Sequence, residues 1–159
     1  MNIVEKKLGN ISPRYLSRFE YLVCSLSQKG GGKDSEKYTT GRSFSNVYEL
    51  YLYAFFLGVR NNVQCEITDG DKTEKFWEVV NWKPASVRDQ FIACAIALSD
   101  FDMAEVEHIS DAEISASVSR LKQTIEAYAN GGLEMLEQSI SADPDSAAGD
   151  MFLLDLLAS

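Results

Sequence analysis

The sequence contains a single histidine in its 159 residues, and this scarcity excludes several classes of enzyme. A Ser/His/Asp or Cys/His mechanism needs a histidine base beside its nucleophile. His108 lies just before the start of a predicted helix, so we interpret it as a surface residue or one that supports a neighbour. No HExxH motif and no twelve-residue EF-hand loop is present. We therefore predict no catalytic residue, no cofactor and no metal site, and we expect a protein that is not an enzyme.

Cysteines and long apolar runs are also scarce. The three cysteines, Cys24, Cys65 and Cys94, form no CxxC pair, which predicts buried free thiols in a reducing compartment. The charged N-terminus does not resemble a signal peptide. The longest apolar runs, 50–59 and 151–158, are too short to cross a bilayer. We expect a cytoplasmic protein that has no membrane partner.

The chain is acidic, but its charge is unevenly distributed. The net charge is −9, whereas residues 1–42 carry eight Lys/Arg and four acids, so this part is basic. An acidic body repels a phosphate backbone, which argues against non-specific nucleic-acid binding by the whole surface. The basic segment either contacts phosphate or an acidic partner, or only keeps the protein in solution. The candidate contact residues are Arg14, Arg18, Lys29, Lys33, Lys37 and Arg42.

Two helices are predicted in the first 60 residues. The first runs from Ser12 to Ser27, because a Ser-Pro start suits a helix N-terminus and apolar residues then recur at helical spacing. Residues 30–42 begin with three glycines and are predicted to form a flexible loop. The second helix is capped by Ser45 or Asn46, of which Asn46 has the spacing of a capping box with Glu49, and it ends at Gly58. This helix is apolar around most of its circumference, which predicts a position at the centre of the core.

Two structures stay open for the segment from Val63 to Trp82. Apolar and polar residues alternate from Val63 to Ile67, and Asp69-Gly70-Asp71 is typical of a turn, so one interpretation is a short β-hairpin. The alternative is a loop followed by a single helical turn. The aromatic residues near Trp82 favour core or interface positions over a platform on which bases stack.

The second half of the chain is predicted to be helical. One helix begins near Ser86, and another begins at the capping box formed by Ser110 and Glu113. The apolar residues of this second helix repeat every three to four positions until Gly131-Gly132, which is predicted to stop it. A further helix covers residues 133–140.

The C-terminal segment 143–159 begins with a break at Asp143-Pro144 and continues as a short, acidic and strongly apolar helix. This helix either packs on the protein's own core or forms an interface by inserting into a groove on a neighbour. The candidate interface residues are Met151, Phe152, Leu154 and Leu157. No repeat or long linker divides the chain, so we predict one all-α domain over residues 1–159. This domain would be a multi-helix bundle. The one β element left open is the short β-hairpin near residues 63–82.

Two stretches resemble a known family. Residues 43–62, with the sequence SFSNVYELYLYAFFLGVRNN, are similar to an F-x-x-V-Y-x-L-x-x-x-A-x-x-L-G-Y-x-N pattern, and residues 128–136, YANGGLEML, are similar to YANGGLEIL. Both patterns occur, in this order, in the small Dnd system-associated proteins, which accompany bacterial DNA phosphorothioate modification and its restriction partners. The resemblance covers roughly residues 40–140. Both stretches read as fold markers, so no catalytic residue is carried over.

The resemblance implies a non-enzymatic accessory or adaptor protein of a bacterial DNA-modification or phage-defence system. Its partner would be a larger protein of that complex, and DNA is a second, weaker option through the basic N-terminal residues. One departure bears on DNA: residues 63–71 are acidic and lack proline, whereas the family has a basic, proline-containing stretch there. The alternative function is a general protein-interaction module or a homo-oligomer that uses the apolar C-terminal helix.

Overall fold

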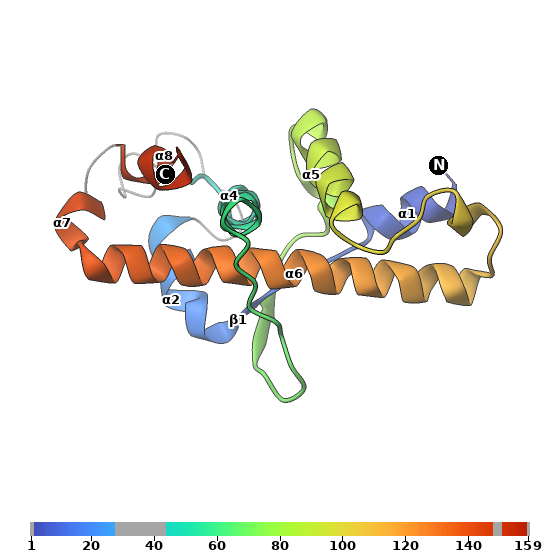
Figure 1. Cartoon of the computed structure of the whole chain (residues 1–159), viewed down its shortest axis with the longest axis horizontal. Coiled ribbons are helices and arrows are strands. Elements are labelled where there is room, and N and C mark those ends of the chain that lie inside the picture. Colours follow the sequence, from blue (N-terminus) through green and yellow to red (C-terminus); the bar gives the residue numbers. More distant parts are fainter. Residues whose placement is uncertain (1, 28–43, 148–150, 159) are drawn as a thin grey trace.

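The computed structural model describes residues 2–27, 44–147 and 151–158. Its largest element is the helix α6, Asp111–Ala142, which extends over the length of the molecule (Figure 1). At 1.5 Å per residue this helix is about 48 Å long. The Ser110 side chain accepts a hydrogen bond from the Glu113 backbone N–H at 3.3 Å, so the predicted N-cap is confirmed. The other elements pack along α6, and the predicted all-α class is confirmed.

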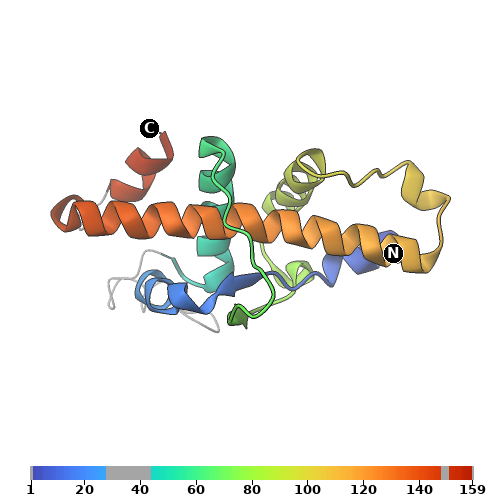
Figure 2. The same ribbon diagram turned by 60° about the horizontal axis from the view of Figure 1, so that its bottom comes forward.

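Helix α4, Val47–Asn61, crosses α6 near the middle of its length and provides the centre of the core (Figures 1 and 2). The Asn46 side chain accepts from the Glu49 backbone N–H at 3.2 Å, as the capping spacing predicted. Nearly every turn of α4 is buried, which explains why its sequence is apolar on most sides. The largest fully buried side chains include Tyr51, Phe55, Leu50, Leu57, Leu121, Ile125, Leu133 and Leu136.

The glycines in these two helices do not end them, and the predicted helix stops at Gly58 and Gly131-Gly132 are wrong. Helix α4 continues to Asn61, where Asn62 adopts the left-handed conformation with φ of 52°. Helix α6 continues for ten residues beyond Gly132. Glycine is required here for close approach: a Cβ on Gly58 would collide with the carbonyl oxygen of Tyr128, and one on Gly132 with the backbone of Ala54. Both glycines let the backbones of α4 and α6 meet without intervening side chains.

The first predicted helix is also different in the structure. Helix α1, Ile3–Gly9, precedes it, and the segment expected to start a helix at Ser12 instead forms the strand β1, Arg14–Leu16. A short 3-10 turn, η1, Ser17–Phe19, leads into helix α2, Glu20–Leu26. Residues 14–16 are extended because their backbone groups bond to α6 and to a second strand, and these partners lie far away in the sequence. The helical spacing of apolar residues therefore describes only the second part of this segment.

The two-stranded antiparallel sheet consists of β1 and β2, Thr73–Lys75, with Arg14 opposite Lys75 and Leu16 opposite Thr73. One strand thus comes from the segment 63–82, and the turn at residues 69–71 is present with Gly70 at φ of 92°. The strand expected at Val63–Ile67 does not pair with β2. It runs along α6, where the Cys65 N–H donates to the carbonyl oxygen of Ala127 at 2.8 Å.

An aromatic cluster joins β2 to the helices. The 3-10 turn η2, Val79–Asn81, places Trp82 in the core with no exposed surface, and the ring stacks at 11° on both Tyr48 and Phe76. The interpretation of these aromatics as core residues is confirmed for Trp82. Helix α5, Ala85–Ala97, follows and places Phe91 against the same indole ring.

The remaining elements lie at the ends of α6. The 3-10 turn η3, Glu105–Glu107, connects α5 to α6, with His108 exposed after it. Helix α6 ends at the predicted break, and the short helices α7, Pro144–Ala147, and α8, Phe152–Ala158, follow. In the described part of the chain no helix is both long and apolar enough to cross a membrane.

Candidate functional site

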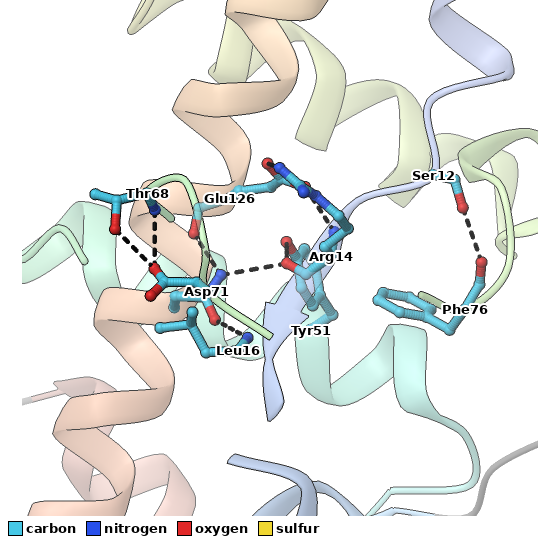
Figure 3. Close-up of polar contacts among 9 residues, drawn as sticks. Ser12, Arg14, Leu16, Tyr51, Thr68, Asp71, Phe76 and Glu126 are labelled. Carbon is cyan, nitrogen blue, oxygen red and sulfur yellow. Dashed lines mark hydrogen bonds and ion pairs between the residues drawn. The ribbon is translucent and has the colours of Figure 1, made fainter. Parts of the chain in front are cut away.

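The most deeply buried charge is the carboxylate of Glu126, on the face of α6 that contacts β1 (Figure 3). Its side chain is 2% exposed and accepts from the Arg14 guanidinium through both oxygens, at 2.9 Å from Nε and 3.1 Å from Nη2. The Arg14 backbone N–H donates to the same carboxylate at 2.9 Å. A buried carboxylate is costly unless it is paired and hydrogen-bonded, and this one has three charge-assisted or backbone donors.

Two neighbouring polar residues complete this polar cluster, which comprises Arg14, Tyr51, Glu126 and Asn130. The Tyr51 hydroxyl donates to the Arg14 carbonyl oxygen at 2.9 Å, and burial raises the pKa of this phenol well above its ordinary value. The Asn130 side chain accepts from the Leu16 N–H at 2.9 Å and donates to the carbonyl oxygens of Arg14 and Glu126 at 3.2 and 2.8 Å. Each of these polar groups bonds to another, so we assign the cluster the role of holding β1 against α4 and α6.

The basic contact residues predicted from sequence do not form one patch in the described residues. Arg14 pairs with Glu126 through a side chain that is 30% exposed, and its role as a partner or phosphate contact stays a prediction. Arg18 is half exposed, with its guanidinium 3.9 Å from Glu134 and 4.3 Å from the centre of the Phe19 ring. The other four candidates lie outside the described residues, as does the loop predicted at 30–42; they are Lys29, Lys33, Lys37 and Arg42.

An apolar groove lies between α1, η2 and α5, with a volume of about 420 Å³. Val80 and Met103 line it with 40% and 47% of their surfaces exposed. Its polar rim includes Arg88, whose Nη1 donates to the Val80 carbonyl oxygen at 2.9 Å and whose Nε lies 3.6 Å from the Asp89 carboxylate. The other apolar lining residues are Leu8, Val79, Ile92 and Ile96. We call this feature the α1–α5 groove.

The sequence did not predict the α1–α5 groove. Ile92 and Ile96 repeat at helical spacing in α5, a pattern typical of core residues, but they are only partly buried and line the groove. Val80 and Met103 lie in segments without helical periodicity, so no pattern marked them.

The C-terminal helix α8 lies beside α4 (Figure 1). Its predicted interface residues divide into two groups by their burial. The Tyr53 hydroxyl donates to the Leu153 carbonyl oxygen at 2.7 Å, and burial raises the pKa of Tyr53 to about 12. Met151 and Leu154 are 55% and 61% exposed. The residues that pack partly buried against the core are Phe152, Leu153, Leu156 and Leu157. Helix α8 thus has one face on the core and one face toward solvent.

A second, polar cavity of about 500 Å³ lies between the 64–67 segment, the end of α5 and α6. The Arg120 Nε lies 3.2 Å from the Asp100 carboxylate at its edge. Nowhere among residues 2–27, 44–147 and 151–158 do three His, Cys, Asp or Glu side chains gather as metal ligands would. Cys24 is exposed and Cys65 and Cys94 are half-buried, so the expectation of buried thiols is wrong for Cys24.

No protein-family model, no curated protein and no solved structure matches this chain.

Proposed function

We propose that this chain is a non-enzymatic adaptor that binds a larger protein through the α1–α5 groove. The observation that carries the proposal is the exposure of Val80 and Met103 in a hollow whose floor is also apolar. Contiguous exposed apolar surface of this kind is typical of an interaction site. Interfaces of this type have an apolar centre and a polar rim, which Arg88 and Asp89 supply here.

The partner segment that suits the groove is an amphipathic helix. A groove between two helices accepts the apolar face of a third, with anchors spaced by three and four residues. The charged lining residues are Glu5, Arg88 and Asp89, and because Arg88 pairs with Asp89, Glu5 leaves one net negative charge that favours neutral or basic residues in the partner over acidic ones. Binding would cover the exposed parts of Val80 and Met103.

The biological setting that we propose is a bacterial DNA-modification or phage-defence system, as the similarity to the Dnd system-associated proteins implies. Both similar stretches lie where α4 and α6 cross, so a shared fold is enough to account for them. Contact with DNA is a secondary part of this proposal. Of the two basic candidates that lie in the described residues, Arg18 is half exposed and Arg14 is bound more closely to its carboxylate, so Arg18 is the more accessible for this contact.

A capture experiment in the native host tests the adaptor proposal. We expect the tagged protein to recover subunits of a DNA-modification or restriction complex, and we expect Val80→Glu with Met103→Glu to abolish that recovery. Tyr21→Glu is the matched control, since Tyr21 is 87% exposed and lies outside the groove. All three side chains are exposed, so the variants should fold, which circular dichroism checks. Equal recovery with the groove variant and the control would refute the assignment of the groove.

A second candidate function is self-association through the exposed face of α8. Leu154 of α8 and Met151 just before it provide the apolar residues, and both are exposed and absent from the residues that pack on the core. Light scattering coupled to size exclusion would show a dimer that becomes a monomer on Met151→Glu with Leu154→Glu. A wild-type protein that is monomeric at high concentration would eliminate this function.

A further inference from the structure

A third hollow, distinct from the α1–α5 groove, carries a different chemistry. It has a volume of about 360 Å³ and lies between the end of α1, the segment before β1, the end of β2 and the first half of α6. Three lysines line it, and no carboxylate does, although the chain as a whole has a net charge of −9. The lining residues are Lys7, Asn10, Ile11, Ser12, Lys75, Ser115, Val118, Ser119 and Lys122.

Three separate elements bring these lysines together. Lys7 lies in the last turn of α1, Lys75 ends β2, and Lys122 lies on α6 one turn before Glu126. The strand register also places Lys75 opposite Arg14, an arrangement of like charges that is unfavourable in a sheet. The nearest buried carboxylate, Glu126, is already occupied by the Arg14 guanidinium. None of the three lysines forms an ion pair with any residue in the described part of the chain.

Hydroxyl groups accompany the lysines on α6. Ser115, Ser119 and Lys122 are spaced by four and three residues and therefore share one face of the helix. The Lys7 ammonium donates to the Ser115 hydroxyl oxygen at 2.7 Å, which leaves the hydroxyl hydrogen free to donate to a ligand. Ser12 is already used, because its hydroxyl donates to the Phe76 carbonyl oxygen at 3.0 Å (Figure 3). The cavity thus presents cationic and neutral donors together.

The surroundings of Lys122 favour the binding of a negatively charged group. Burial lowers its pKa, and Arg14 and Lys75 lower it further, while Glu126 opposes the shift. The protonated form of Lys122 is therefore less favourable here than in water, and an anion bound in the cavity would stabilise that form.

We propose that this cavity binds a phosphate group, held by Lys7, Lys75 and Lys122 with the hydroxyl groups of Ser115 and Ser119. Phosphate suits the site because it accepts several hydrogen bonds at once and carries close to two negative charges as a monoester at neutral pH. The volume lies near the lower end of the range for small-molecule sites, which suits one phosphate with a small attached group. The acidic remainder of the surface favours a small phosphorylated molecule over duplex DNA.

Nuclear magnetic resonance with the full chain and inorganic phosphate as the probe tests the site. We expect the backbone amide signals of Ser115, Ser119 and Lys122 to shift with added phosphate and to reach saturation. We expect Lys122→Gln to weaken this binding about tenfold, as loss of one charge-assisted hydrogen bond would do. Lys83→Gln is the control, because Lys83 is exposed and does not line the cavity, and its binding should equal that of the wild type.

Two further titrations identify the source of the phosphate. Glycerol phosphate that binds at least as tightly as phosphate, with no competition by a short DNA duplex, assigns a small phosphorylated molecule. A duplex that displaces phosphate from the same residues assigns a nucleic-acid backbone to the same site. The proposal is overturned if shifts are linear and equal to those from chloride at matched ionic strength, or if Lys122→Gln binds phosphate as the wild type does. Neither result depends on the α1–α5 groove.

Discussion

Replacing Gly132 by alanine tests the close crossing of α4 and α6 on which the whole fold depends. Gly132 lies inside α6, and an added Cβ would lie 2.9 Å from the Cα of Ala54 and nearer still to that residue's carbonyl group. The obstacle is backbone inside another helix, so no side-chain rotation can relieve it. The two helices would have to separate along the crossing.

Two opposing effects determine the magnitude. Alanine favours an isolated helix over glycine by about 1 kcal/mol, so helix propensity alone predicts stabilisation. Overpacking a tight core typically costs about 1–3 kcal/mol, and a clash with rigid backbone belongs at the upper end of that range. We therefore expect Gly132→Ala to lower the free energy of unfolding by about 2 kcal/mol. For a chain of this size that corresponds to a decrease of roughly 4–8 °C in melting temperature.

Urea unfolding followed by circular dichroism measures this change. The matched control is Ala116→Gly, the reverse exchange at an exposed position of the same helix, which should cost about 1 kcal/mol through propensity alone. Alanine should thus be preferred at position 116 and glycine at position 132. If Gly132→Ala is neutral or stabilising, the two backbones do not meet there, and the reasoning about the crossing is wrong.

The remaining predictions concern the polar cluster and α8. Glu126→Gln should lower the free energy of unfolding by about 2 kcal/mol in urea titrations, because Arg14 loses a buried charged partner, whereas Glu134→Gln at a more exposed pair should cost less than about 0.5 kcal/mol. Because burial raises the pKa of Tyr53 to about 12, the unfolded chain loses this proton first, so stability should fall as the pH rises from about 10 to 12. The difference in phenolate absorbance between the wild type and Tyr53→Phe reports the titration of Tyr53. If the two proteins had equal stability at alkaline pH, the prediction would be contradicted. Deleting α8 should leave a folded chain with a lower melting temperature, since no α8 residue is fully buried; complete loss of helical circular dichroism would assign α8 to the core.

Local chemistry was enough to predict several elements correctly. The caps at Asn46 and Ser110 were recognisable because an N-cap involves residues only three positions apart. The break at Asp143 followed from the proline after it, and the turn around Gly70 from the sequence of that turn. The central position of α4 followed from the absence of a polar face. Each of these predictions depends on interactions within one or two turns of the chain.

The features that differ from prediction depend on contacts between distant residues. Arg14 reads as a surface cation until Glu126 is placed beside it, and residues 14–16 read as helix until their backbone partners are known. The α1–α5 groove also depends on contacts between distant residues. The helical spacing of Ile92 is typical of a core residue, and only the packing around α5 shows that it lines the groove.

The sequence by itself determined the helical class, the starts of α4 and α6 and the acidic charge, because propensity, capping and composition are properties of neighbouring residues. Only the tertiary structure decided the role of the glycines: the sequence Gly131-Gly132 reads as a helix stop, but it lies inside a continuous helix because another backbone occupies the space of its side chains. The tertiary structure also brought Lys7, Lys75 and Lys122 into one cavity. These lysines lie far apart in the sequence, so the sequence gives no sign that they line one cavity. Their electrostatic interaction depends only on their distance in space.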